Sequence, residues 1–191
     1  MRLRLNDPLV TSFFYQEKKY TIDMAFDNVL DAFDVLGDQT LREQEKAEIC
    51  LVLLLNESCK GEEAINLWNY LYERFIKVEN IQPIEYDLKG KPLPVREEVS
   101  KNLISLEKDA GYIYASFQQA YNLNLFDQQG KLHWQEFQAL LQGLPSDTIM
   151  QRIIQIRMWE PSKGETSEYK QAMKKLQNLY ALDDGEIEEV D

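Results

Sequence analysis

Hydrophobic residues recur at helical spacing along most of the chain, and this pattern predicts a mainly α protein. Three N-terminal stretches, 22–36, 41–55 and 61–78, carry apolar residues three or four positions apart. The second stretch becomes apolar on all sides toward Leu55, which predicts that its C-terminal half lies at the centre of the core. Apolar helices this close in sequence are expected to pack as antiparallel neighbours.

The C-terminal part of the chain predicts more helices. Stripes at helical spacing mark a helix over about 97–121 and another that begins at Trp134. Ser146 or Asp147 is expected to cap a helix that runs to about Trp159, and a last helix follows Gly164. Their inward residues would be Leu106, Ala110, Ile113, Phe117, Ala120, Trp134, Phe137, Leu140, Leu141, Leu144, Ile149, Ile153 and Ile156, with Tyr169, Met173, Leu176 and Tyr180 on one face of the last helix.

Residues 12–21 have a different pattern. Aromatic and β-branched residues flank a four-residue polar turn, which predicts a short hairpin. We therefore expect a multi-helix bundle of about six to seven helices with a small N-terminal β-hairpin.

Proline and glycine indicate how the chain is divided. Pro83, Gly90, Pro92 and Pro94 lie among charged residues and exclude a continuous helix there. We predict a hairpin with three helices over 1–79, a linker over 80–96, a C-terminal helical unit over 97–182 and an acidic tail over 183–191. Within the C-terminal unit, the segment from Leu106 to Trp159 is expected to form three helices packed together.

Charge excludes several classes of partner. The chain has 191 residues and a net charge of −12, with a sequence pI near 4.6. Neither nucleic acid nor an anionic membrane surface is expected as a partner, since both require concentrated Lys and Arg. The longest apolar run, from Ile49 to Leu55, is too short to cross a bilayer, and the first residues do not resemble a signal peptide. We therefore expect a cytoplasmic protein.

Few residues suggest chemistry. Cys50 and Cys59 lack metal-ligand spacing and are expected to be buried side chains. The loop from Leu125 to Glu136 resembles a calcium-binding EF-hand loop, but Leu125 stands where an oxygen ligand is needed. His133 has no nucleophile at readable spacing, and we interpret it as a histidine with a structural hydrogen bond at a helix start. No catalytic residue, metal site or cofactor is therefore predicted, and an enzyme is not expected.

Several aromatic residues do not fit the inward stripes. Tyr70, Tyr72, Tyr112, Tyr114 and Trp159 are therefore candidates for a binding surface, because exposed aromatic residues commonly anchor protein partners. The alternative is that the buried faces are wider than these stripes.

The segment 105–158 carries a resemblance to a known family. It contains Asp109 to Phe117, Leu132 to Phe137, Leu140 to Pro145 with Thr148, and Ile156-Arg157. In these residues the chain resembles the bacteriophage gene product fifteen family, from tailed phages and prophages of Gram-positive bacteria. The residues expected to form its structural motif are Asp109, Phe117, His133, Trp134, Phe137, Leu141, Gly143, Leu144, Pro145 and Arg157.

This resemblance implies a role in tail assembly. Such proteins are similar to tail assembly chaperones, which bind the helical tape-measure protein, aid assembly of the tail-tube protein and are absent from the finished particle. The expected location is the cytoplasm of the bacterial host. A second copy of the chain is a further candidate partner. The alternatives are a structural tail or connector component retained in the virion and a degenerate EF-hand-like calcium-binding or interaction protein.

Overall fold

The computed structural model describes residues 5–77 and 103–182. These residues form two compact units. Unit 1 contains residues 5–77 together with Leu125–Gln142, and unit 2 contains residues 103–124 together with 143–182. The predicted linker and acidic tail lie outside the described residues, so the division into folding domains at 80–96 stays a prediction. The prediction of one three-helix unit from Leu106 to Trp159 is wrong, because the middle helix packs in unit 1.

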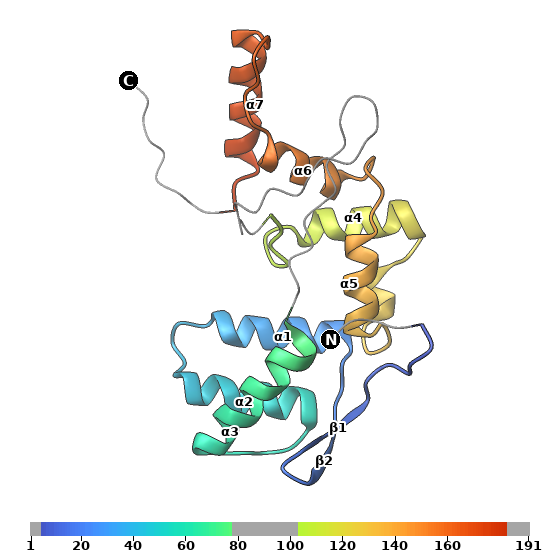
Figure 1. The fold of residues 1–191 in the computed structure, drawn as a ribbon, viewed down its shortest axis with the longest axis vertical. Coiled ribbons are helices and arrows are strands. Elements are labelled where there is room, and N and C mark those ends of the chain that lie inside the picture. Colours follow the sequence, from blue (N-terminus) through green and yellow to red (C-terminus); the bar gives the residue numbers. More distant parts are fainter. Residues whose placement is uncertain (1–4, 78–102, 183–191) are drawn as a thin grey trace. The chain divides into compact units, whose positions relative to one another are not determined.

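The predicted fold class is confirmed. The described part of the chain is mainly helical, with seven α-helices and an N-terminal two-stranded antiparallel hairpin (Figure 1). The elements are β1 (Ser12–Tyr15), β2 (Lys18–Thr21), α1 (Phe26–Gly37), α2 (Glu43–Leu55), α3 (Gly61–Leu71), η1 (Tyr72–Ile76), α4 (Ala110–Tyr121), η2 (Leu125–Gln128), α5 (Trp134–Gln142), α6 (Ile149–Met158) and α7 (Ser167–Leu179).

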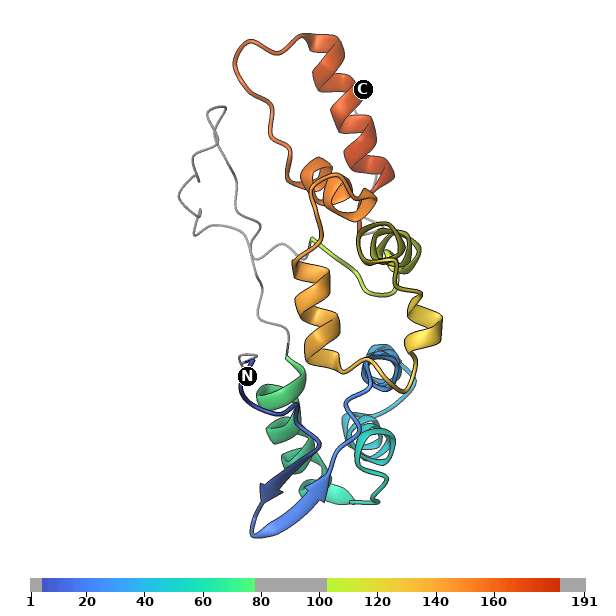
Figure 2. The ribbon, with the colours of Figure 1, turned by 90° about the vertical axis from the view of Figure 1, so that its right-hand side faces the viewer.

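The hairpin has a tighter turn than predicted. Gln16 and Glu17 both have positive φ, 46° and 65°, which makes a two-residue turn between β1 and β2 (Figure 2). Such a turn matches the right-handed twist of paired strands. The hairpin packs on η1 through Phe13, whose ring stacks on Tyr20 at 5.5 Å and lies 5.2 Å from Phe75. The hairpin is thus stabilised by packing, as an isolated hairpin requires.

Helix α1 begins at Phe26, four residues later than the periodicity predicted. Ile22 and Met24 are buried, but residues 22–25 are not helical. The backbone of this segment bonds outside any helix: Ile22 N–H donates to Thr11 O and Asp23 N–H donates to Leu54 O. These distant partners compete with a helical turn, so apolar spacing alone misplaced the helix start.

Helix α2 packs between α1 and α3, and its environment corrects the sequence prediction. Leu51, Leu54 and Leu55 are buried, as expected. Ile49, Val52 and Leu53 are exposed, with 38%, 47% and 36% of their surface accessible. The prediction that the C-terminal half of this helix is central in the core is therefore wrong. Two neighbouring helices cover two sides of α2, and the third side stays open in unit 1.

The predicted third helix is observed with a change of pitch. Helix α3 ends at Leu71, and one π-helical turn, η1, continues to Ile76. A π turn shifts the side chains that follow it relative to the α-helical stripe. Phe75 and Ile76 are buried in this turn, and Ile76 O is free to accept a side-chain bond described below.

Unit 2 has a shorter first helix than predicted. Residues 97–102 lie outside the described part, and Leu103–Asp109 is not helical, so α4 begins at Ala110. Asp109 turns the chain here, because its carboxylate accepts from Ser105 N–H at 2.9 Å. Ala110 is exposed and Leu106 half-buried, contrary to the predicted stripe, whereas Ile113 and Phe117 are buried.

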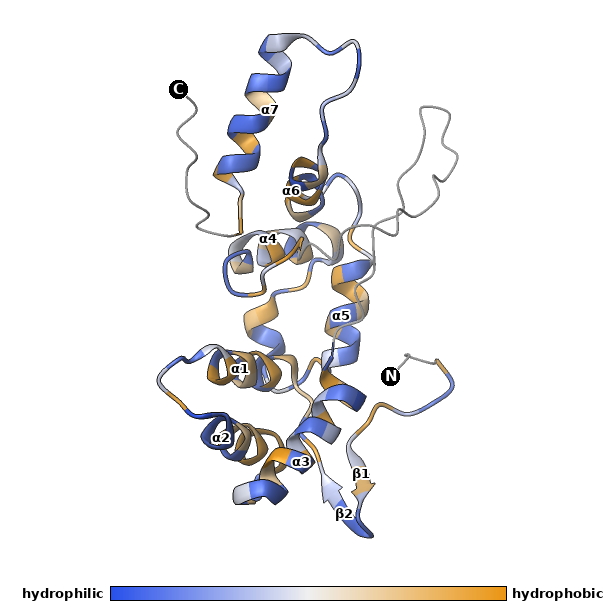
Figure 3. Cartoon of the chain, turned by 60° about the vertical axis from the view of Figure 1, so that its left-hand side comes forward, coloured by the Kyte–Doolittle hydropathy of each residue, from blue (hydrophilic) through white to orange (hydrophobic). Residues whose placement is uncertain are grey.

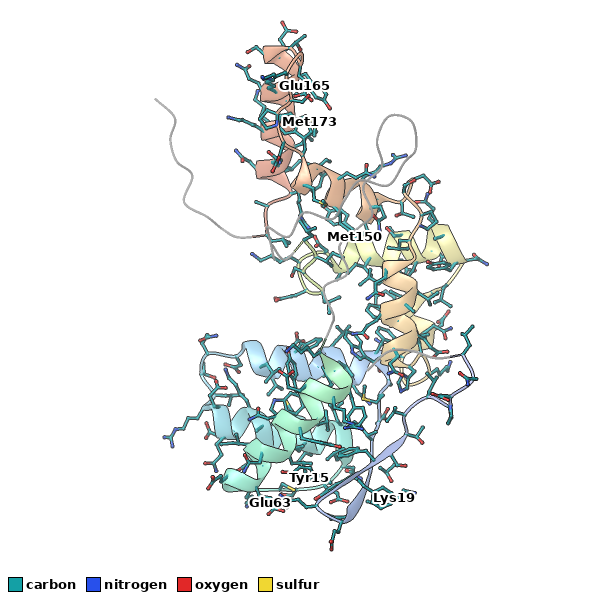
Figure 4. The ribbon with its side chains drawn as sticks, in the orientation of Figure 1. Tyr15, Lys19, Glu63, Met150, Glu165 and Met173 are labelled. Carbon is teal, nitrogen blue, oxygen red and sulfur yellow. The ribbon has the colours of Figure 1, made fainter. Side chains whose placement is uncertain are left out.

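Helices α6 and α7 complete unit 2. The residue before α6 is Thr148, so the prediction of Ser146 or Asp147 as its cap is wrong. Thr148 is fully buried, and its hydroxyl donates to Pro145 O at 2.7 Å. Met150, labelled in Figure 4, is also fully buried, and its N–H donates to Ser116 Oγ on α4. Helix α7 contains no buried residue and contacts α6.

Candidate functional site

The starts of α1 and α5 are tied together by backbone pairing. Ala25 and His133 form an antiparallel bridge, in which Phe26 N–H donates to Leu132 O at 2.9 Å and Trp134 N–H donates to Met24 O at 2.7 Å. Both helices therefore start from one short paired segment, although they lie far apart in sequence. This pairing explains why α5 belongs to unit 1.

Aromatic rings fill the space beside this bridge. The ring of Phe137 stacks on Phe26 at 5.1 Å and on Trp134 at 5.5 Å, and Phe33 meets Trp134 edge-on at 5.6 Å. Trp134 is 1% exposed, and its indole N–H donates to Ile76 O at 2.9 Å. A buried indole needs such an acceptor, and the carbonyl at the end of η1 supplies it. Two residues of the predicted motif thus hold the centre of unit 1.

His133 is the residue from which α5 starts. Its Nδ1 accepts from Gln135 N–H at 3.2 Å, and Glu136 accepts from His133 N–H at 3.1 Å. Because Nδ1 accepts, the proton lies on Nε2, which donates to Val10 O at 3.1 Å. Both ring nitrogens are therefore engaged, one in capping α5 and the other in fixing the segment that precedes the hairpin. This is the structural arrangement expected for a histidine at a helix start.

The loop that resembles an EF-hand is attached to α1. Leu125 is buried at the start of η2, and Gly130 has a φ of +67°. Gly130 N–H donates to both carboxylate oxygens of Asp27, at 3.0 and 3.1 Å, in the first turn of α1. In the described residues no three His, Cys, Asp or Glu side chains come together as a metal site would require. The loop positions α5 on α1.

Arg157 and Asp109 form a buried ion pair in unit 2. The guanidinium donates to both oxygens of Asp109, at 2.7 and 2.8 Å, and the two side chains are 9% and 2% exposed. Arg157 also donates to Leu103 O and Tyr180 O, each at 2.7 Å. One guanidinium therefore joins the start of α4, the end of α6 and the end of α7. Nearly every donor is used, as a buried charge requires.

The other predicted motif residues are divided between the two units. Phe117 and Leu144 are buried in unit 2, where Pro145 supplies the carbonyl that Thr148 binds. Leu141 is half-buried at the end of α5, and Gly143 is exposed in the turn after it. Phe117 and Leu144 are thus packing residues of unit 2.

The five aromatic residues predicted to bind a partner are divided between the two units. Tyr70 and Tyr72 belong to unit 1, and Tyr112, Tyr114 and Trp159 belong to unit 2. Tyr70 packs under the hairpin, 5.0 Å from Tyr15 and 5.9 Å from Phe13. Trp159 meets Tyr169, and Tyr112 meets Tyr180. Tyr112 has 37% of its surface exposed, and the others are half-buried, so their binding role stays a prediction.

The open side of α2 is the apolar surface that the sequence analysis missed. We call Ile49, Val52 and Leu53 the α2 face. They lie at i, i+3 and i+4, which places them on one side of the helix. The segment from Phe26 to Leu71 contains ten acidic and three basic residues, and one of the three, Lys46, is buried and paired with Glu43. The α2 face therefore lies in a strongly acidic helical segment.

The two thiols of unit 1 differ in environment. Cys50 is buried, its Sγ lies 3.6 Å from Ala32 O on α1, and burial raises its pKa to about 12. Cys59 is half-buried in the turn before α3, and burial followed by the nearby Glu63 raises its pKa as well. A thiol with a raised pKa is a poor nucleophile at neutral pH. Neither thiol has the environment of a reactive cysteine.

Comparison with known proteins gives one finding. The family model described as Bacteriophage Gp15 protein matches residues 5–182. No curated protein and no solved structure matches the chain. A search for helices able to cross a membrane, made over the described residues, finds none that is both long and apolar enough. Since the family model covers nearly the whole chain, the protein belongs to the Bacteriophage Gp15 family.

Proposed function

We propose that this protein is a non-enzymatic tail assembly chaperone. It would bind the apolar stripe of the tape-measure protein in the host cytoplasm and keep that protein soluble while tail-tube subunits assemble. The observation that carries the proposal is the α2 face in a member of this family: three adjacent aliphatic side chains lie open on a helix in an acidic segment. An exposed apolar face with polar surroundings is typical of a protein-binding surface.

The shape and charge of this surface suit a helical client. Residues at i, i+3 and i+4 present a narrow ridge, which matches the side-by-side packing of two helices. A long amphipathic helix exposes an apolar stripe, and covering that stripe removes the surface through which it aggregates. Acidic residues around the contact favour a client whose stripe is flanked by Lys or Arg.

Co-expression tests the proposal. The tape-measure protein from the same gene cluster is produced alone, with the wild-type chain, and with a Val52→Lys variant. We expect the wild-type chain to keep the tape-measure protein in the soluble fraction and to be recovered bound to it, whereas Val52→Lys loses most of both effects. The matched control is Asn66→Lys, which adds the same charge at an exposed position of α3.

Two results would contradict the proposal. One is a tape-measure protein that is equally insoluble with and without the chain. The other is the presence of the chain in purified particles in stoichiometric amount, measured by mass spectrometry, because that result would indicate a structural tail component instead.

A further inference from the structure

The exposed side of α2 changes character along the helix. It is charged at the start and apolar farther on, and Figure 3 shows hydrophilic colour giving way to hydrophobic colour along α2. Glu45 and Asn56, both exposed, lie at the two ends of the α2 face. Residues 45, 49, 52 and 56 are four, three and four positions apart, so they form one stripe along the helix. The stripe has a carboxylate at one end, two aliphatic side chains in the middle and an amide at the other end.

This order of side chains is complementary to its own reverse. When two such stripes run antiparallel, Ile49 of one lies beside Val52 of the other in both central layers. Glu45 then lies beside Asn56 of the other stripe in both outer layers, where the amide donates to the carboxylate. A parallel arrangement would instead bring the two Glu45 carboxylates together, and facing like charges repel. The stripe therefore matches a second copy of itself in one orientation.

The polar groups around the stripe are placed to allow this contact. One oxygen of Glu45 accepts from Arg42 N–H at 2.8 Å, which holds the carboxylate at the start of α2 and leaves its other oxygen to accept from a partner. Asn56 ends the helix with a φ of 52°, and its side chain makes no hydrogen bond within residues 5–77 and 103–182. The carboxylate of Glu48, beside the stripe, is turned toward α3, where it accepts from Gly61 N–H at 3.0 Å. It therefore does not occupy the apolar centre.

We propose that the free chain pairs with a second copy through antiparallel contact of their α2 faces. Both copies use the same surface about a two-fold axis, so the assembly closes at a dimer. The contact is made by unit 1 of each copy, and its geometry is set by α2 alone. Leu53 flanks the stripe on the side away from Glu48 and adds apolar area to the contact.

The size and charge of the chain set the strength of this pairing. Three aliphatic side chains per copy, between 36% and 47% exposed, form a small contact of less than about 1,200 Å² in total, the range of weak and reversible complexes. We therefore expect a dissociation constant of about 100 μM. Each copy carries a net charge of −12, so the copies repel each other, and added salt should strengthen the pairing by screening this repulsion.

Pairing would cover the surface that we assign to the tape-measure protein. A client helix would then displace the second copy, so the α2 face would stay covered until the client is present. This consequence rests on the proposed function, whereas the pairing itself concerns the purified chain alone. The two can therefore fail separately: a chain that pairs but leaves the tape-measure protein insoluble contradicts only the proposed function.

Analytical ultracentrifugation of the full chain, from about 10 μM to about 1 mM, tests the pairing. The wild-type chain is expected to show a monomer–dimer equilibrium that strengthens as salt rises from about 50 to about 500 mM. Ile49→Glu puts a carboxylate into the apolar centre of the contact and should raise the dissociation constant at least about ten-fold. The matched control, Asn66→Glu, adds the same charge at an exposed position of α3 and should pair as the wild-type chain does. Circular dichroism verifies that each variant is folded.

Cysteine cross-linking tests the orientation. Cys59 is first replaced by Ser, because it is half-buried near Asn56 in sequence, whereas Cys50 is buried and is kept. Glu45→Cys and Asn56→Cys are then made separately in this background. In the antiparallel pair, position 45 of one copy faces position 56 of the other, while the two positions 45 are displaced by eleven residues, about 16 Å along the helix axis. Mild oxidation should therefore join the two variants in a mixture and leave each variant alone unlinked.

Three outcomes would overturn the inference. The first is a wild-type chain that stays monomeric over the whole concentration range. The second is self-association that Ile49→Glu does not weaken, because the contact would then lie elsewhere on the chain. The third is a mixture of Glu45→Cys and Asn56→Cys that links no better than either variant alone, because the two α2 helices would then not be antiparallel.

Discussion

At the centre of unit 1 the indole of Trp134 lies fully buried against the ring of Phe137, whereas at the centre of unit 2 the guanidinium of Arg157 lies against the carboxylate of Asp109. Both centres come from the segment that resembles the family. The centre of unit 1 joins α5 to α1 through the packing of buried aromatic rings. The centre of unit 2 joins three helix ends through directed hydrogen bonds. The same family motif therefore stabilises two units by different physical means.

This difference has consequences for how each unit responds to change. An aromatic core loses stability in proportion to the volume removed from it. A buried ion pair contributes little net stability, because desolvation offsets the attraction, yet removal of one partner leaves an unpaired buried charge. Unit 1 should therefore be sensitive to side-chain size, and unit 2 to the loss of one charge without the other.

The largest effect is expected at Trp134. Trp134→Ala removes the indole from its stack and leaves Ile76 O without its donor, so the free energy of unfolding should fall by about 3–5 kcal/mol. Trp134→Phe keeps a ring in place and should cost about 1–2 kcal/mol, mainly through the lost hydrogen bond. Urea unfolding followed by circular dichroism measures both. A cost for Trp134→Ala no greater than that of Trp134→Phe would contradict the assignment of this ring as the centre of unit 1.

The stability of unit 2 should depend on the balance of charge in the ion pair rather than on side-chain size. Asp109→Leu leaves the Arg157 guanidinium buried without its carboxylate and should cost about 3 kcal/mol. The double variant Asp109→Leu/Arg157→Leu removes both charges and should be more stable than Asp109→Leu alone. The exposed pair Lys77–Glu73 is the matched control, and Lys77→Gln should leave the urea midpoint unchanged. A double variant less stable than either single variant would show that unit 2 depends on the pair itself.

His133 allows a finer test of unit 1. His133→Ala removes the acceptor for Gln135 N–H and the donor to Val10 O, and we expect a loss of about 1 kcal/mol. His133→Asn retains a side-chain oxygen able to cap the helix and should cost less. The thermal midpoints of the two variants report the difference. Equal losses would mean that the bond to Val10 O, which only the imidazole reaches, dominates over capping.

The sequence predicted helices wherever apolar periodicity decides the structure locally. The hairpin at 12–21 and the helices after Leu41, Gly61 and His133 were found because turn residues and apolar stripes agree there. The predicted helix start at Ile22 and the predicted helix over residues 103–109 were wrong, since Asp23 and Asp109 bond to partners that no local pattern reveals. Long-range hydrogen bonds overrode local propensity at both positions.

The candidate site was predictable in part, for a similar reason. The capping role of His133 follows from its position before a helical stripe, whereas the pairing of Arg157 with Asp109 spans 48 residues and leaves no sequence signal. The α2 face was missed because an all-apolar helix gives no information about which side is covered. Residues 49–55 are apolar on every side of the helix. Such a run indicates either a helix surrounded by the core or a helix with one exposed apolar side, and the second is what the structure shows.

The smallest expected effect concerns α7, the element that joins neither centre through a buried side chain. Thr166 caps this helix, and its hydroxyl oxygen accepts from Tyr169 N–H at 3.2 Å. Thr166→Ala should destabilise α7 locally by about 0.5–1 kcal/mol, which corresponds to amide hydrogen exchange in its first turns about two to five times faster. Because α7 has no buried residue, the global urea midpoint should stay unchanged, unlike that of His133→Ala. Thr166→Ser keeps the acceptor and serves as the control. A global urea midpoint lowered by Thr166→Ala as much as by His133→Ala would contradict this expectation. It would mean that α7 unfolds together with the Arg157–Asp109 ion pair. The contrast between α7, on the surface of unit 2, and α5, at the centre of unit 1, would then be lost.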